Sequence, residues 1–170
     1  MGYMFYECES VKKLELNNFD TSSVTNIEGM FSGCKSIKEL DLSSFDTSKV
    51  NNMHGMFAMA SQLSSLDIAN FDTSNVEDAK AMFKNCSNLR SIQISNKFVI
   101  PESENSYMFE GVSNLTAIIT TSPIPVANQF KGMLPETATL YVPNGSEDAY
   151  RTTLSGDTSS SKIKPIIEPI

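Results

Sequence analysis

His54 is the only histidine among the 170 residues of the chain. A Ser-His-Asp arrangement needs a histidine base, and a zinc site needs several His or Cys ligands, commonly with a CxxC pair. The chain has no CxxC pair and no phosphate-binding glycine loop. We therefore expect no catalytic residues, no metal site and no cofactor, and we expect His54 to lie at the surface.

The cysteines recur at related intervals, because Cys34 follows Cys8 by 26 residues (34 − 8) and precedes Cys86 by 52 (86 − 34). Ala60 occupies the position midway between the last two, and alternation of Cys with a small apolar residue indicates buried thiols. We expect three buried thiols. A disulfide between Cys8 and Cys34 stays open as an alternative, because adjacent repeats can bring such positions within bonding distance.

A carboxylate also recurs every 26 residues, at Asp20, Asp46 and Asp72, and each is followed by Thr-Ser. Calcium takes several oxygen ligands at once, whereas each of these motifs offers a single carboxylate. An Asp side chain before a turn can accept backbone N–H groups. We expect these residues to cap turns rather than to bind calcium.

These intervals follow from a repeat that runs through most of the chain. The pair Met-Phe begins at residues 4, 30, 56, 82 and 108, with every difference equal to 26, and Phe-Asp-Thr-Ser begins at residues 19, 45 and 71. Two motifs with one period indicate a solenoid, in which each coil buries its apolar edge against its neighbours. The Met-Phe pairs are therefore expected in the core.

Residues 37–45 carry the pattern Ile-x-x-Leu-x-Leu-x-x-Phe, which has the spacing of a leucine-rich repeat. Leu40 and Leu42 alternate as in a short strand, whereas apolar residues at positions 24, 27, 31 and 34 step by three or four as in a helix. The expected fold class is α/β: a leucine-rich-repeat solenoid, or right-handed β-α superhelix, with short parallel strands on one face and short helical segments on the other. Phe replaces the usual Asn or Cys at the last position, and we expect a stacked spine of Phe19, Phe45 and Phe71 to fill that edge.

The pattern divides the chain into a solenoid of about five coils over residues 3–120 and a C-terminal capping segment over residues 121–170. In the capping segment, residues 139–143 predict a strand, Asn144-Gly145 a turn, residues 146–150 the start of a helix and residues 163–170 an extended segment. Because Met4-Phe5 already belongs to a repeat, further repeats are expected upstream in a longer protein.

Residues 45–57 and 29–42 resemble BspA-like leucine-rich repeats, in particular the subgroup found in mycoplasma lipoproteins. Residues 138–150 are similar to the closing unit of such proteins in gut bacteria. The resemblance implies a secreted or surface-anchored bacterial protein that serves in adhesion to host matrix proteins, other bacteria or epithelial cells. An extracellular or cell-surface location rests on the resemblance alone, because residues 1–7 lack the pattern of a signal peptide.

One side chain between the two core positions of each strand is expected to point outward, so that these positions form a column along the stack. The candidate ligand-binding residues are this column and its neighbours: Lys13, Glu15, Glu39, Asp41, Asp67 and Gln93. An acidic sheet suits a basic patch on a partner protein. A solvated face that keeps the rod soluble is the alternative, since no aromatic residue, a usual anchor of interfaces, falls in the column.

The formal net charge of −7 argues against nucleic acid as a partner, because binding to phosphates needs a Lys/Arg surface. No run of about 18 apolar residues indicates insertion into a membrane. We expect a monomeric, non-catalytic adhesion or protein-interaction module, with a host matrix protein, a cell-surface protein or a glycan as its partner. The alternative is a structural spacer or stalk that carries another domain and has no ligand of its own.

Overall fold

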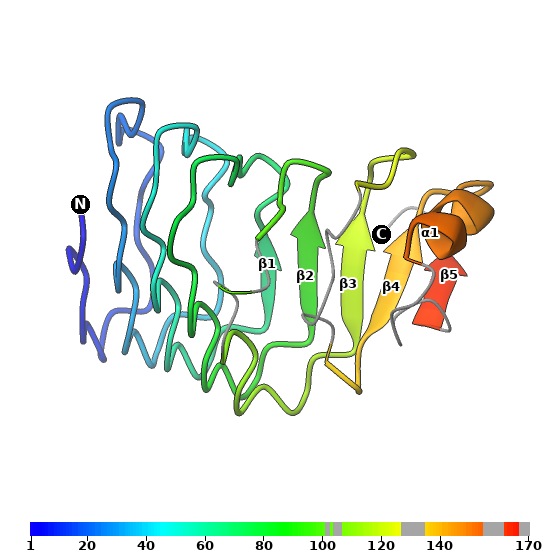
Figure 1. The fold of residues 1–170 in the computed structure, drawn as a ribbon. Coiled ribbons are helices and arrows are strands. Elements are labelled where there is room, and N and C mark those ends of the chain that lie inside the picture. The colour runs from blue at the N-terminus through cyan, green and yellow to red at the C-terminus, as the bar shows by residue number, and fades with distance from the viewer. Residues whose placement is uncertain (101–102, 104–106, 127–134, 155–161, 167–170) are drawn as a thin grey trace.

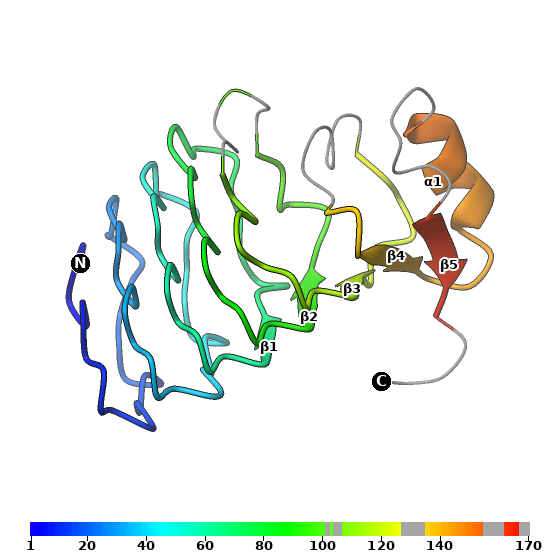
Figure 2. The same cartoon turned by 90° about the horizontal axis from the view of Figure 1, so that it is seen from below.

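The computed structural model describes residues 1–100, 103, 107–126, 135–154 and 162–166. The chain winds into coils that lie side by side along one axis, from the N-terminus to the C-terminal helix (Figure 1). Seen from below, the strands line up along one side of this stack (Figure 2). We name the coils from one Met-Phe pair to the next: the first coil is residues 4–29, the second 30–55, the third 56–81 and the fourth 82–107.

Within the described residues, five strands form one parallel sheet in the order of the sequence. They are β1 (Ser65–Asp67), β2 (Ser91–Ile94), β3 (Ala117–Thr120), β4 (Thr139–Val142) and β5 (Ile163–Pro165). Leu66 of β1 pairs with Ile92 of β2, which pairs with Ile118 of β3, so that the register keeps the 26-residue period (92 − 66 and 118 − 92). The predicted repeat solenoid, with parallel strands along one side, is therefore confirmed.

The first two coils keep the alternation of a strand without forming regular strands in the described residues. Leu40 is half-buried, Asp41 is exposed and Leu42 is buried. Side chains of residues 39–42 thus alternate between the interior and the solvent in the same way as those of β1. The side of the stack formed by these segments and the five strands is called the strand face below.

The side of each coil opposite the strand face is a series of tight turns, and the helical segments predicted there are wrong. The N–H of Met30 donates to the C=O of Ile27, three residues back, at 3.2 Å. An α-helix needs bonds to the fourth residue back. The next N–H, of Phe31, instead crosses to the C=O of Met56 in the neighbouring coil at 2.8 Å. Because alternate N–H groups bond to the next coil, this side, called the turn side below, cannot wind into a helix.

Two positions per period on the turn side have left-handed backbone. They are occupied by Gly29 and Gly33, with φ of 55° and 75°. These two positions keep a positive φ in every period, including those in which the residue is not glycine. The first position holds Tyr3, Gly29, Gly55, Ala81 and Tyr107, and the second holds Glu7, Gly33, Met59, Asn85 and Gly111. Left-handed backbone costs a residue with a Cβ about 1–2 kcal/mol. The ladder of bonds between coils therefore imposes this conformation on residues that disfavour it.

The Met-Phe pairs form the core of the stack, as predicted. Met30, Met56 and Met82 are buried. Their Phe neighbours stack ring on ring through the coils, with centroids 5.3–5.8 Å apart and planes 1–12° from parallel, in the order Phe5, Phe31, Phe57, Phe83 and Phe109. We call these five rings the Phe column. It follows the axis of the solenoid and contacts every coil.

The stacked spine predicted for Phe19, Phe45 and Phe71 is wrong, although Phe45 and Phe71 are buried. Phe45 contacts the ring of Phe31 with centroids 6.5 Å apart at a tilt of 36°, and Phe19 contacts Phe5 at a tilt of 59°. These rings pack against the side of the Phe column instead of stacking on one another. The parallel stack belongs to the rings of the Met-Phe pairs.

A ladder of threonines joins the coils beside these tilted rings. The Oγ1–H of Thr21 donates to the C=O of Asp46 in the next coil, and the N–H of Asp46 donates to the same Oγ1. Thr47 repeats both bonds with Asp72, and Thr73 is buried in the equivalent place. The threonine of Phe-Asp-Thr-Ser therefore supplies a hydrogen-bond partner to both the C=O and the N–H of the Asp in the next coil.

The C-terminal strands continue the same sheet. The predicted strand and helix start are confirmed as β4 and α1 (Glu147–Thr153). Tyr150 of α1 is fully buried, and its hydroxyl donates to the C=O of Ser122 at 2.8 Å. Of the extended segment predicted over residues 163–170, β5 and residue 166 are described, and residues 167–170 lie outside the described ranges. The division into a solenoid and a capping segment stays a prediction.

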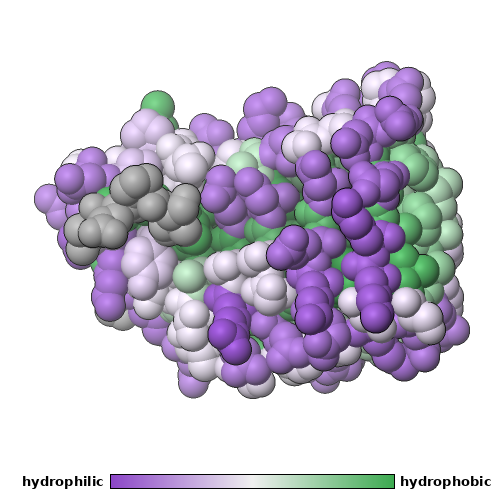
Figure 3. All heavy atoms as spheres, turned by 180° about the vertical axis from the view of Figure 1, so that it is seen from behind, coloured by the Kyte–Doolittle hydropathy of each residue, from purple (hydrophilic) through white to green (hydrophobic). Residues whose placement is uncertain are grey.

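Apolar side chains are exposed at the N-terminal end of the stack. Met4 is 46% exposed, whereas Met30, one period later, is 0% exposed. Tyr3 and Tyr6 are exposed beside it. Seen from behind, the right-hand end of the molecule, where the N-terminal coil lies, is correspondingly apolar (Figure 3). Each coil is thus shielded by its neighbours, as expected when no coil can bury its edge alone.

Candidate binding surface on the strand face

The six predicted site residues lie along the strand face. Lys13, Glu15, Glu39, Asp41 and Asp67 are exposed and Gln93 is half-buried. Asp67 pairs in register with Gln93, and Gln93 with Ile119. The column therefore changes from acidic to neutral to apolar along the axis, and its charged part belongs to the first three coils.

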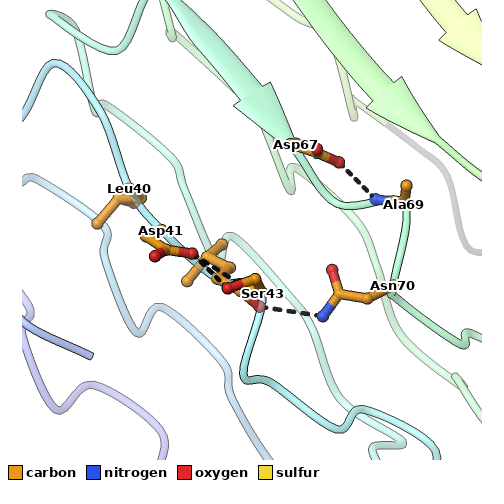
Figure 4. Close-up of a pocket in the computed structure, with 7 residues that line it drawn as sticks. Leu40, Asp41, Ser43, Asp67, Ala69 and Asn70 are labelled. Atoms are coloured by element: carbon orange, nitrogen blue, oxygen red, sulfur yellow. Dashed lines mark hydrogen bonds between the residues drawn. The ribbon is translucent and has the colours of Figure 1, made fainter. Parts of the chain in front are cut away.

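Asp41 and Asp67 are exposed, and their carboxylates also accept hydrogen bonds that close local turns. One carboxylate oxygen of Asp41 accepts the N–H of Ser43 at 3.1 Å and its hydroxyl at 2.6 Å. Asp67 accepts the N–H of Ala69 at 3.0 Å (Figure 4). The hydroxyl of Ser43, followed by its N–H, holds the pKa of Asp41 below its ordinary value. These carboxylates therefore close a turn at the end of each strand segment while the rest of the side chain faces solvent.

A hollow of about 270 Å³ opens between these two turns. Asn70 holds one wall, because its amide Nδ2 donates to the C=O groups of Leu42 and Phe45 at 3.0 and 2.8 Å. Asp41 and Asp67 lie on the other walls, as the close-up in Figure 4 shows. The lining residues are Leu40, Asp41, Leu42, Ser43, Asp67, Ala69 and Asn70. The hollow is thus a fixed, acidic depression with an apolar base.

A second hollow, of about 420 Å³, adjoins the first and shares Asp41 with it. Its lining is charged with both signs: Lys12, Lys13, Leu14, Glu15, Asn17, Lys38, Glu39 and Asp41. Lys13 and Glu15 form an exposed ion pair of 2.6 Å, and the hydrogen bond from Lys13 to Glu15 raises the pKa of the lysine. An exposed pair of this kind is held weakly and can exchange for a ligand.

Sequence reasoning missed the basic side of this surface. Lys12 and Lys38 border the second hollow, and Arg90 is exposed at the equivalent position two periods on. The signal was present in the sequence, since 38 − 12 is 26 and 90 − 38 is 52. These basic residues lie at the start of each strand segment, just before the alternation around the two leucines that predicts outward side chains.

The cysteines differ from the prediction in one respect. Cys34 and Cys86 are buried, and their thiols donate to the C=O groups of Phe5 and Phe57 at 3.1 and 2.9 Å. Burial raises the pKa of Cys34 to about 11 and that of Cys86 to about 12. Cys8 is half-buried rather than buried. All three are free thiols in this structure.

The recurring Asp residues cap turns, as predicted. Asp20, Asp46 and Asp72 each accept the N–H of the residue two positions on, at 2.9–3.1 Å. His54 is half-exposed, with its Nδ1 3.4 Å from a carboxylate oxygen of Asp78. Within the described ranges, no three His, Cys, Asp or Glu side chains are placed to hold a metal ion.

No helix in the described part of the chain has the length and hydrophobicity that crossing a membrane requires. A search of curated proteins and a search of solved structures each found no match. A family model does match, over residues 1–122 of the 170. The chain therefore belongs to DUF285, a family described as Mycoplasma protein of unknown function.

Proposed function

We propose that the chain is a non-catalytic protein-interaction or adhesion module of a bacterial cell-surface protein, and that it binds its partner through the strand face. The finer assignment, to leucine-rich-repeat solenoids of the BspA-like type, is part of this proposal. The partner would be a host matrix or cell-surface protein, or a glycan. The repeat motifs that resemble that type support an extracellular role.

The observation that carries the proposal is the pair of adjoining hollows on the strand face. They are bordered by exposed charges from successive coils, and the turns at Asp41 and Asp67 hold their walls in place. A surface that is fixed before binding loses little conformational entropy when a partner docks. A protein partner is favoured over a glycan, because neither hollow has an aromatic residue in its lining.

A spacer or stalk is the second candidate, and a different observation favours it. Ring stacking in the Phe column and hydrogen bonds in the threonine ladder connect each coil to the next. Continuous bonding along one axis suits a rod that holds another domain at a distance. A spacer needs no ligand on the strand face, so a binding experiment separates the two candidates.

The test is a binding screen of the purified chain against immobilised host matrix proteins, mucins and glycans, at low and physiological salt. The informative variant combines Asp41→Asn with Asp67→Asn. Asparagine keeps an oxygen that can accept the turn hydrogen bonds, so charge is removed and the turn stays closed. The matched control combines Asp20→Asn with Asp46→Asn, which removes the same charge from the same kind of turn outside the hollows.

Saturable binding that is lost in the strand-face variant and kept in the control supports the proposal. Equal loss in both variants means that net charge, rather than this site, governs binding, and rejects the strand face. No binding to any member of the panel favours the spacer.

A further inference from the structure

Two lines of opposite charge run along the strand face, and Lys13, Glu39 and two leucines lie between them. Lys12 and Lys38 form the basic line at the start of the strand segments, and Glu15, Asp41 and Asp67 form the acidic line three residues further on. Both lines are exposed. We call the depression that they border, made of the two adjoining hollows, the two-charge groove.

The base of the two-charge groove is mixed, because the exposed side chains of Lys13 and Glu39 line it beside two leucines. Leu14 and Leu40 line the hollows and are half-buried, whereas Leu66 and Ile92 at the same position in the next coils are buried. The strands lie toward the rear in Figure 1, so the view from behind looks onto the strand face. It shows rows of hydrophilic side chains with an apolar strip between them (Figure 3).

The width of the groove matches one extended chain. Three residues of extended chain separate the basic line from the acidic line, which is roughly 10 Å at about 3.3 Å per residue. An extended peptide lying along the axis of the solenoid directs successive side chains to opposite sides, with a period of two. If acidic and basic residues alternate in it, every acidic side chain points to one line and every basic side chain to the other.

We propose that the two-charge groove binds an extended peptide segment of a partner protein in which acidic and basic residues alternate. This inference rests on the proposed function and names the chemistry of its partner. The acidic side chains of the peptide lie toward Lys12 and Lys38, the basic ones toward Glu15, Asp41 and Asp67, and its backbone covers Leu14 and Leu40. At Glu15, the basic side chain of the peptide replaces Lys13 in the exposed ion pair. A uniformly charged ligand is disfavoured, because it meets repulsion from one of the two lines.

The experiment is an NMR titration of the full chain with two synthetic peptides. One alternates Glu and Lys, and the other has the same residues in two blocks, all Glu and then all Lys. Composition and net charge are identical, so only the pattern differs. We expect the alternating peptide to bind about tenfold more tightly, to shift the amide signals of Leu14, Leu40 and Ser43, and to weaken as salt rises.

Two neutralised variants assign the binding to the groove. Lys12→Gln with Lys38→Gln removes the basic line. Asp41→Asn with Asp67→Asn neutralises two of the three residues of the acidic line, leaves Glu15, and keeps the turns. Each is expected to lower the affinity for the alternating peptide about tenfold. Lys35→Gln with Lys49→Gln, and Asp20→Asn with Asp46→Asn, remove equal charge elsewhere and are expected to leave the affinity unchanged.

Equal affinity for the two peptides overturns the inference, and so does an affinity that neither groove variant lowers. Tighter binding of an all-Lys or an all-Glu peptide also overturns it, since a single line of charge would then suffice. The proposed function can survive these results if a partner found in the screen is still lost with Asp41→Asn and Asp67→Asn. It fails separately if the screen finds no partner.

Discussion

The two sides of each coil share the 26-residue period but repeat different features. On the turn side the period repeats a backbone arrangement: N–H groups cross from coil to coil, Met and Phe fill the interior, and left-handed positions recur. On the strand face the inward residues repeat while the outward ones change from charged to neutral to apolar. The repeated contacts of the turn side therefore hold the coils together, whereas the outward positions of the strand face vary from coil to coil.

The largest expected effect comes from breaking the Phe column on the turn side. Phe57→Ala removes a fully buried ring that stacks on Phe31 and Phe83. We expect the free energy of unfolding to fall by about 3–5 kcal/mol, because transfer and cavity costs add. Urea denaturation measures it. Glu39→Ala, on the strand face, is the control, and a similar loss there would contradict the division between the two sides.

The next effect tests the left-handed positions. Gly33→Ala places a Cβ at a φ of 75°, 3.1 Å from Cγ and 3.2 Å from Cα of Glu7. We expect a loss of about 1–2 kcal/mol in urea denaturation. No change would mean that the backbone between the first two coils can relax without cost.

The reverse substitution is expected to stabilise the fold. Ala81 has a φ of 57° at the equivalent of Gly55. Ala81→Gly relieves that conformation, and we expect a gain of up to ~1 kcal/mol, reduced by the greater freedom of glycine in the unfolded chain. A rise in the urea midpoint is the readout. A loss of stability would show that strain at this position is negligible.

The smallest expected effect is a dependence of stability on pH. It involves the turns capped by Asp20, Asp46 and Asp72 as well as the turn closed by Asp41 on the strand face. The pKa values of Asp20, Asp41, Asp46 and Asp72 lie below their ordinary value of 3.8, chiefly because the side chain of the serine two residues on donates to each carboxylate. A folded-state pKa below the unfolded one means that these groups stabilise the fold above about pH 4. Their contribution is lost as the pH falls through the lower folded-state values.

We therefore expect the urea midpoint to decline on acidification below about pH 4. A variant with all four Asp residues changed to Asn should decline less steeply, because its turns no longer titrate. Parallel declines in the two proteins would contradict the assignment of these shifts to the turns.

Much of the architecture was predictable because it repeats. The period, the parallel strands, the buried Met-Phe pairs and the capping Asp residues all follow from identical residues at identical intervals. The strand-face column was predictable too, since alternation around Leu40 and Leu42 places Asp41 outward. The charged groove was missed in part, because its basic line lies at the start of the strand segments, where alternation gives no signal.

The sequence alone determined that this chain stacks 26-residue units around a Met-Phe core, because each unit must hide the same apolar side chains. Tertiary structure decided whether the turn side forms helix or turns, since the choice depends on N–H groups that bond to another coil. It also decided which Phe rings stack and which positions adopt left-handed backbone, where Ala81 and Gly55 share one conformation despite different preferences. These outcomes depend on contacts between residues about 26 apart, and spacing within one unit does not encode them.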